Sequence, residues 1–222
     1  MKILINNEIT NNGFETAVGP CASLPFRSAG IIVDLYGDTS VSHDTPAHLN
    51  RIANNEITDN VGDGISVFQA YKNEIVSNHI ARNGSVPAVG DAPSDKGNGI
   101  SLFCTEGGIS GAVTTGNLMY RNTIEHNADN GIFVGKFCEV TSTPTSDSNA
   151  FNPIVENTIY ENGRVSGTAD PSNDDGIGID LQDQSNLSAV SYTSGNTNIN
   201  ENDTALTDGG NQMADTPVIT SA

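Results

Sequence analysis

The chain has 222 residues, and its nine Lys plus Arg stand against 27 Asp plus Glu, a formal net charge of −18 at pH 7. Binding to nucleic acid through counterion release requires a basic surface, so this charge argues against a nucleic-acid partner. No apolar run approaches the roughly 18 residues that a membrane-spanning helix needs. Met1 is followed almost directly by LINNEIT, so we expect no signal peptide within this sequence.

The cysteines and aromatic residues limit how the interior is built. Three cysteines, Cys21, Cys104 and Cys138, are too few for a disulfide scaffold, and their spacing matches no zinc site. The sequence leaves two alternatives open: the cysteines are buried free thiols, or Cys104 and Cys138 form a disulfide bridge. Tryptophan is absent and aromatic residues make up 5% of the chain. Something other than large apolar side chains must therefore organise the core.

Taken in chain order, the predicted elements follow a sequence pattern, N-x-I-x-x-N, that occurs five times. Its copies are Asn7-Ile9-Asn12, Asn55-Ile57-Asn60, Asn78-Ile80-Asn83, Asn122-Ile124-Asn127 and Asn157-Ile159-Asn162. An apolar residue lies five positions before each isoleucine, at Leu4, Ile52, Ile75, Met119 and Ile154. A further asparagine lies two positions before that apolar residue in the last four copies, at Asn50, Asn73, Asn117 and Asn152. A Gly-Ile-x-apolar step follows each copy, at Gly30-Ile31-Val33, Gly64-Ile65-Val67, Gly99-Ile100-Leu102, Gly131-Ile132-Val134 and Gly176-Ile177-Ile179.

The spacing of the copies predicts short strands joined by corners. Apolar residues two apart, such as Ile65 and Val67, follow the strand period and not the helical one. The shortest full repeat, from Asn55 to Asn78, is 23 residues. Longer copies differ by insertions at two corners only: 13–29, 84–98 and 163–175 at one, and 37–49, 105–116 and 136–151 at the other.

We therefore expect an all-β fold in which each copy is one rung of three short strands. Rungs about 4.8 Å apart would stack into a parallel β-helix of about five rungs. Asparagine at the corners tolerates left-handed backbone, and stacked asparagines can form hydrogen-bonded ladders. The glycine before each isoleucine suits a corner that needs positive φ.

This pattern resembles the right-handed parallel β-helix repeats of the pectate-lyase-like superfamily, particularly those of secreted and periplasmic bacterial proteins. The resemblance covers residues 3–181 and implies a single-stranded right-handed parallel β-helix over 1–181. Residues 182–222 would be a polar C-terminal cap or a tail that leads to a further domain. It also implies an extracellular or cell-surface location, and helix ends that could contact an oligomer partner or a flanking domain. Lyases, hydrolases, epimerases, adhesins and tailspikes share this architecture, so it fixes no single activity.

Three aspartates are the candidate catalytic residues. Asp129 lies in NADNGIFV, and Asp174 and Asp175 lie in NDDGIGID, each just before a Gly-Ile step. These stretches are similar to the acidic steps of polygalacturonase-like glycosidases, in which paired carboxyl groups flank the scissile bond. The His-Gly and Arg-x-Lys elements of that family are missing. The alternative is that these aspartates cap turns or bind calcium.

Other candidate residues lie in the insertions and in the polar C-terminal part. Tyr36, Lys136 and Arg164 are candidate substrate-binding residues in insertions that could wall a groove for a polysaccharide. His79 and His126 lie inside the repeat, where a structural role is expected. Oxygen-rich stretches at 183–186 and 198–210 could bind calcium, but no metal site can be assigned.

The sequence thus favours an extracellular carbohydrate-active module that binds a polysaccharide and, as a glycosidase or lyase, cleaves it. The alternative is a non-catalytic structural or adhesive β-helix segment of a larger surface protein. Whether the chain is an enzyme is left open by its sequence.

Overall fold

The computed structural model of the chain describes residues 2–12, 29–34, 48–68, 70–84, 97–103, 114, 116–134, 152–162, 177–181, 192–194, 197–199, 204–208 and 218–220. Within these residues all regular secondary structure is β-strand, and the strands form three parallel sheets that we call A, B and C. No helix long and apolar enough to cross a membrane occurs in this described part of the chain.

Each sheet is built from strands of three to five residues. Sheet A contains β1 (Ile3–Ile5), β4 (Arg51–Ala53), β7 (Glu74–Val76), β10 (Leu118–Tyr120), β13 (Pro153–Val155) and β16 (Tyr192–Ser194). Sheet B contains β2 (Glu8–Thr10), β5 (Glu56–Thr58), β8 (His79–Ala81), β11 (Thr123–Glu125), β14 (Thr158–Tyr160), β17 (Thr197–Ile199) and β19 (Val218–Thr220). Sheet C contains β3 (Ile31–Asp34), β6 (Ile65–Phe68), β9 (Ile100–Phe103), β12 (Ile132–Val134), β15 (Ile177–Leu181) and β18 (Thr204–Asp208).

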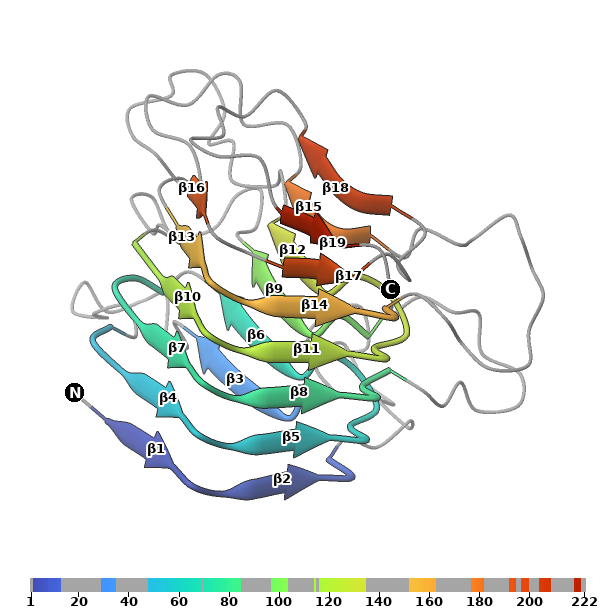
Figure 1. Cartoon of the computed structure of the whole chain (residues 1–222). Coiled ribbons are helices and arrows are strands. Elements are labelled where there is room, and N and C mark those ends of the chain that lie inside the picture. The colour runs from blue at the N-terminus through green and yellow to red at the C-terminus, as the bar shows by residue number, and fades with distance from the viewer. Residues whose placement is uncertain are drawn as a thin grey trace, which may run out of the picture.

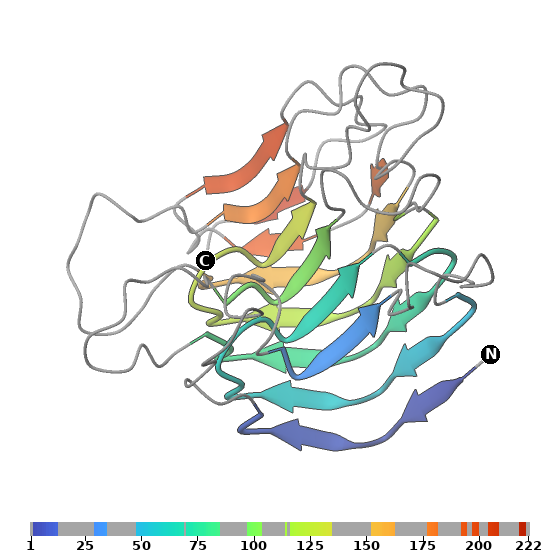
Figure 2. The same cartoon turned by 180° about the vertical axis from the view of Figure 1, so that it is seen from behind.

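The chain runs through sheets A, B and C in turn, so that one strand of each sheet makes one rung (Figure 1). Strands of successive rungs pair in parallel with equivalent residues opposite each other, as Ile57 is opposite Ile80. The five sequence repeats are therefore five rungs of a parallel β-helix, which confirms the predicted fold. Figure 2, turned by 180°, brings sheet C to the front.

Strands also follow the last sequence repeat. β16, β17 and β18 add a sixth layer to the three sheets, and β19 pairs with β17 in sheet B. These strands lack the repeat pattern of the first five rungs, so the sequence did not indicate them. The division at residue 181 between a β-helix and a cap or tail stays a prediction.

The core consists of apolar columns that run along the stack. In a three-residue strand the middle side chain points to the opposite face from its two neighbours, so one residue per strand faces inward. On sheet B the inward residues of rungs two to five are fully buried isoleucines: Ile57, Ile80, Ile124 and Ile159. Burying one isoleucine contributes about 1.5–3 kcal/mol. A column of such residues supplies the core without large aromatic side chains.

Three asparagine ladders run along the corners between the sheets. The backbone N–H and the side-chain Nδ2 of one asparagine donate to Oδ1 of the asparagine in the following rung, as from Asn60 to Asn83 at 3.2 and 2.8 Å. The same Nδ2 also donates to a carbonyl of the preceding rung, as from Asn83 to Ile57 O at 3.1 Å. The ladders consist of Asn50, Asn73, Asn117 and Asn152; of Asn7, Asn55, Asn78, Asn122 and Asn157; and of Asn12, Asn60, Asn83, Asn127 and Asn162. The predicted ladders are thus confirmed.

Wherever the structure describes both residues, the left-handed backbone lies at the residue before the ladder asparagine and not at the asparagine itself. Twelve described non-glycine residues have φ between 52° and 58°, and only three of them are asparagines. They are Asn6, Asn11, Leu49, Asn54, Asp59, Lys72, Ser77, Arg82, Arg121, His126, Glu156 and Glu161. This corrects the expectation that the corner asparagines take this conformation. The ladder asparagine aligns its N–H with the next rung, so its predecessor makes the bend.

A glycine directly precedes β3, β6, β9 and β12 and allows close approach between rungs. None of these four glycines has the positive φ that the sequence pattern predicted, so that expectation is wrong. A Cβ atom on Gly64 would lie 2.5 Å from Ile80 Cγ2 and 2.7 Å from the carbonyl oxygen of Gly99. Both distances are far below van der Waals contact, so no larger residue fits at Gly64 without displacing the next rung.

The glycine of the fifth rung is Gly178. A Cβ atom on Gly131 would lie 2.6 Å from the carbonyl oxygen of Gly178, and Ile132 is opposite Ile179 in the sheet. The sequence pattern predicts this step two residues earlier, at Gly176, and this prediction is wrong. Both Gly-Ile steps of GIGIDL fit the repeat pattern, and only the strand pairing selects the second.

Replacing Asn83 by alanine is expected to lower the free energy of unfolding by about 3–4 kcal/mol. Asn83 is 0% exposed, and its loss removes the acceptor of the backbone N–H and Nδ2 of Asn60 and one donor to the carbonyl of Ile57. A buried polar group that loses its partner costs about 1–3 kcal/mol. Urea denaturation measures the change. The matched control is Asn12→Ala at the exposed end of the same ladder, where about 1 kcal/mol is expected. Equal losses in the two variants would contradict the role of the ladder.

Replacing Leu49 by asparagine is expected to raise the free energy of unfolding by up to about 1 kcal/mol. Leu49 is 52% exposed and has φ of 55°, a left-handed conformation that asparagine adopts more readily than leucine. Leu49→Val should have the opposite effect, because a β-branched residue is strained there. Thermal denaturation of the three proteins gives their order, and a Val variant as stable as the Asn variant would refute the explanation.

Candidate functional site

The outer face of sheet B carries a row of acidic and imidazole side chains. In β5, β8 and β11 the central isoleucine faces the core, so the residues beside it face outward. This places Glu56 of rung two directly opposite His79 of rung three. Glu125 of rung four lies diagonally across from His79, because it is opposite Ala81.

His79 lies between two carboxylates. Its Nδ1 is 2.8 Å from both carboxylate oxygens of Glu56, and its Nε2 is 2.7 Å from Oε1 of Glu125. Burial alone would lower the pKa of His79, but the hydrogen bonds to Glu125 and Glu56 outweigh it and raise the pKa above its ordinary value. His79 therefore keeps its proton to a higher pH than a free histidine, and in its protonated form it links the two glutamates as a cation.

The row continues into rung five. Oε2 of Glu125 is 3.7 Å from Nδ1 of His126, and Nε2 of His126 pairs with Glu161. We call Glu56, His79, Glu125, His126 and Glu161 the Glu–His row. It joins rungs two to five across one face of the stack, with Glu125 only 15% exposed.

Charged pairs beside the row also connect successive rungs. Arg82 forms a two-pronged contact with Asp59, with Nε and Nη2 each 2.9 Å from a carboxylate oxygen. The hydrogen bond from Arg82 lowers the pKa of Asp59. Two further ion pairs have a single contact of 2.7 Å between a guanidinium nitrogen and a carboxylate oxygen: Arg51 with Glu74, and Arg121 with Glu156. Exposed pairs contribute about 0–1 kcal/mol each, so together they reinforce the stacking without determining it.

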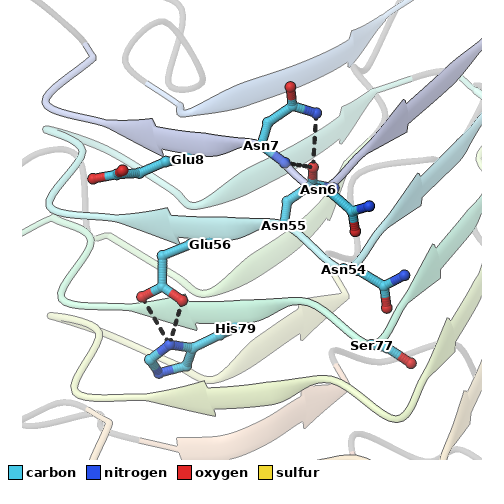
Figure 3. Close-up of a pocket in the computed structure, with 8 residues that line it drawn as sticks. All are labelled: Asn6, Asn7, Glu8, Asn54, Asn55, Glu56, Ser77 and His79. Carbon is cyan, nitrogen blue, oxygen red and sulfur yellow. Dashed lines mark hydrogen bonds and ion pairs between the residues drawn. The ribbon is translucent and has the colours of Figure 1, made fainter.

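A shallow, open depression of about 490 Å³ adjoins one end of the Glu–His row (Figure 3). It is lined by Asn6, Asn7, Glu8, Asn54, Asn55, Glu56, Ser77 and His79. Figure 3 shows Glu56 turned toward His79, whereas Asn54 and Ser77 extend away from this pair. Small-molecule sites are usually concave and mostly apolar. An open depression lined only by polar residues does not fit that description.

The Glu–His row is better suited to holding rungs together than to catalysis. A general base needs a free nitrogen lone pair directed at the substrate. Both ring nitrogens of His79 instead face carboxylates. Among the described residues, no group of three or more His, Cys, Asp or Glu side chains is arranged to hold a metal ion.

Sheet C is the sheet that adjoins the insertions. Segments 13–29, 84–98 and 163–175 precede its strands, and 37–49, 105–116 and 136–151 follow them. Between sheets A and B, by contrast, the first five rungs all have a bend of two residues, as between β4 and β5. Any groove walled by the insertions would therefore have the outer face of sheet C as its floor.

A buried polar cluster lies under the outer face of sheet C. Ser66 and Ser101 are opposite each other on the outward side, yet both are fully buried. Ser101 donates to Oδ2 of Asp63, while Oδ1 of Asp63 accepts from the backbone N–H and Nδ2 of Asn98 at 2.8 and 3.0 Å. Asn130 in turn donates to Asn98. Asp63 thus ends a fourth, shorter ladder and acts there as a structural acceptor.

Of the predicted catalytic residues, Asp129 alone lies in the described part of the chain. Asp129 is only 6% exposed, and its backbone N–H donates to the carbonyl of Gly97 at 3.1 Å. Asp174 and Asp175 lie outside the described residues. Because Gly178 is the glycine of their rung, they precede it by four and three residues. Asp129, by contrast, lies two residues before the glycine of its own rung, Gly131, so the three aspartates do not occupy equivalent positions.

The remaining predicted site residues are not tested. Tyr36, Lys136 and Arg164 lie outside the described residues, as do Cys104 and Cys138. Segment 183–186 is outside them too, and only the strand backbone is described within 198–210. The substrate-binding and calcium assignments therefore stay predictions.

The position of His79 and His126 inside the repeat predicts a structural role, but it does not reveal the glutamates that contact them. Glu8, Glu56 and His79 share the position before the central isoleucine of the repeat, and Glu125 has the position after it. Aligning the polar as well as the apolar positions of the repeats would have placed these side chains on one face.

Comparison with known proteins supports the fold. A family model described as "Right handed beta helix region" matches residues 2–214. No curated protein and no solved structure matches the chain. The family match agrees with the three parallel sheets, whereas the narrower resemblance to the pectate-lyase-like superfamily stays a prediction.

The position of His79 predicts a pH dependence of stability. Its pKa is higher in the folded than in the unfolded chain, so its contribution is fully present below about pH 6.5 and is lost as the pH rises through the raised pKa. The side chain is 34% exposed, so the loss should not exceed about 1 kcal/mol. Thermal midpoints measured upward from pH 6 test this. His79→Gln should abolish the loss and the control His48→Gln should keep it; a loss unchanged in His79→Gln would exclude the mechanism.

Proposed function

Because the chain belongs to the right-handed β-helix family, we propose that it is an extracellular module that binds a polysaccharide along the outer face of sheet C. The observation that carries this proposal is the distribution of the insertions. In the first five rungs they adjoin sheet C, and the bend between sheets A and B is always two residues. Connecting segments on a rigid scaffold are where binding residues concentrate.

The repeat of the scaffold suits a polymer as ligand. Six layers about 4.8 Å apart give sheet C a length of roughly 24 Å along the stack. An extended chain of sugar units could contact several rungs at once. Phe133 is half-buried on the outward side of β12 and lies opposite Ser101 of β9. An aromatic side chain there offers an apolar face with little conformational freedom to lose.

The charge of the protein narrows the choice of polysaccharide. A formal net charge of −18 repels a polyanionic chain unless a cation such as calcium lies between them. We therefore favour a neutral polysaccharide. Cleavage is a separate step, in which Asp129 would act with carboxylates of the following rung, and the binding proposal does not depend on it.

A non-catalytic structural or adhesive segment is the second candidate. The observation that favours it is that six ion pairs on sheets A and B and their corners join different rungs, three of them in the Glu–His row. These faces are organised to keep the stack together, which is what a spacer or stalk requires.

The two candidates are separated by a panel of neutral and acidic polysaccharides tested for binding. Phe133→Ala should weaken binding to the preferred polysaccharide at least about fivefold, because an aromatic contact contributes about 1 kcal/mol or more. The matched control is Tyr120→Ala on the outer face of sheet A, which should bind like the unchanged protein. Equal midpoints of thermal unfolding would show that both variants are folded.

Two product assays on the same panel test cleavage. Reducing ends report hydrolysis, and absorbance of unsaturated products reports a lyase. Release that disappears in Asp129→Asn would support a catalytic role for Asp129. Absence of both binding and products across the panel would reject the carbohydrate proposal in favour of the structural one.

A further inference from the structure

Several asparagines of the ladders are followed directly by glycine. The sequence contains five Asn-Gly pairs, and the asparagine of every pair belongs to one of the ladders. The pairs are Asn12-Gly13, Asn83-Gly84, Asn98-Gly99, Asn130-Gly131 and Asn162-Gly163. Asparagine is a thermolabile residue, because the following backbone nitrogen can attack its side-chain amide. Glycine hinders this attack least, because it has no side chain.

The fold requires both residues of such a pair. The asparagine is required because its side chain carries the ladder bonds, and the glycine is required because the rungs approach closely. A Cβ atom on Gly84 would lie 2.3 Å from Cα of Gly97, and Gly84 has φ of 81°. A Cβ atom on Gly99 would lie 2.4 Å from Cγ2 of Ile124. A larger residue does not fit at either position without displacing its neighbour, so the corners themselves bring a reactive pair together.

In the folded chain, hydrogen bonds occupy both groups that would react at Asn83. The backbone N–H of Gly84, which must lose its proton to attack, donates to the carbonyl of Asn60 at 2.8 Å. Nδ2 of Asn83 donates to the carbonyl of Ile57 and to Oδ1 of Asn127. Asn83 is 0% exposed, so water does not reach its side chain. The side chain cannot turn toward Gly84 without breaking the ladder.

The fourth ladder holds Asn98 in the same way. The backbone N–H of Gly99 donates to the carbonyl of Asn130 at 2.9 Å. Nδ2 of Asn98 donates to Oδ1 of Asp63 at 3.0 Å, and Oδ1 of Asn98 accepts from Nδ2 of Asn130 at 3.0 Å. Asn98 is also buried. Two ladders that lie at different positions of the repeat therefore engage the reacting groups alike.

We propose that the Asn-Gly pairs of the ladders are latent deamidation sites, which the folded rungs keep unreactive and which react when a rung opens. In an opened rung the nitrogen of Gly84 bonds to Cγ of Asn83, and the bond from Cγ to Nδ2 breaks. The proton of the attacking nitrogen leaves with the amide group as ammonia. Water then opens the cyclic succinimide at one of its C–N bonds and leaves aspartate or isoaspartate. Water is the one co-reactant, and the chain supplies the nucleophile.

A chain that has reacted in this way cannot rebuild the ladder. A carboxylate in place of the Asn83 amide would face the carbonyl of Ile57 and Oδ1 of Asn127 without a hydrogen to donate, and a buried charge without a partner is costly. In place of Asn98 it would face the carboxylate of Asp63. Isoaspartate would also add a carbon atom to the main chain and disturb the register. Opening is thus made irreversible by a chemical change, and this inference is independent of polysaccharide binding by sheet C.

Peptide mapping of the full chain by mass spectrometry tests the protection. The chain is incubated at mildly alkaline pH, folded in one sample and unfolded in guanidinium chloride in the other. Deamidation at Asn83, Asn98 and Asn130 should be at least about a hundredfold slower in the folded chain, because it waits for a rare opening of a buried corner. Equal rates in the two samples would overturn the proposal.

Refolding tests the consequence. Samples held unfolded for increasing times and then diluted should lose the ability to regain the native circular dichroism spectrum in step with deamidation at these sites. At mildly acidic pH both processes should slow together, because the attacking nitrogen must lose its proton. Complete refolding of chains that mapping shows to be deamidated at Asn83 and Asn98 would overturn the proposal.

A variant that reproduces the product separates deamidation from other damage to the unfolded chain. Asn83→Asp should lower the thermal midpoint or prevent folding. The matched control is Asn54→Asp, because Asn54 is exposed, lies outside the ladders and has the left-handed backbone that aspartate tolerates. The control should keep the thermal midpoint of the unchanged chain. An unchanged midpoint in Asn83→Asp would overturn the proposal.

Discussion

The hydrogen bonds of the asparagine ladders are the constraint on which the stack depends. Each strand is short and buries only one or two apolar side chains. Much of the backbone therefore lies at the corners, where its N–H and C=O groups also need hydrogen-bond partners. A ladder asparagine such as Asn83 uses both amide hydrogens and its oxygen in bonds to neighbouring rungs. Because Oδ1 also accepts the backbone N–H of the rung before, the ladder fixes rung spacing and register together. The apolar columns can then align.

This requirement also determines where the chain can vary. The bend between sheets A and B consists of one left-handed residue and one ladder asparagine, as in Asn54 and Asn55, and leaves no room for insertion. At the other corners the insertions lie on the sheet C side of the ladder, after Asn83 or before Asn117, where they leave the ladder bonds intact. The insertions therefore occur beside sheet C, because an insertion there does not break the hydrogen bonds of the ladders.

The outer faces and the corners of the stack have different chemistry for the same reason. Outward side chains on sheet B are free of the ladder, and in the Glu–His row they add ion pairs between rungs. The three asparagine ladders pass their side-chain hydrogen bonds from Nδ2 to Oδ1 toward the C-terminal end of the stack, whereas the short ladder from Asn130 to Asp63 runs in the opposite direction.

The sequence by itself determined the strands, the ladder asparagines and the corners of the first five rungs, because each rung repeats the same local requirement and has a residue equivalent to Ile57 and one equivalent to Asn60. Only the tertiary structure decided contacts that differ between rungs. The pairing of β12 with β15 chose Gly178 over Gly176 as the glycine of the fifth rung. The contacts of His79 with Glu56 and Glu125 join residues 23 and 46 apart that do not recur in the other rungs. Such contacts arise from strand pairing between distant segments, which local periodicity does not encode.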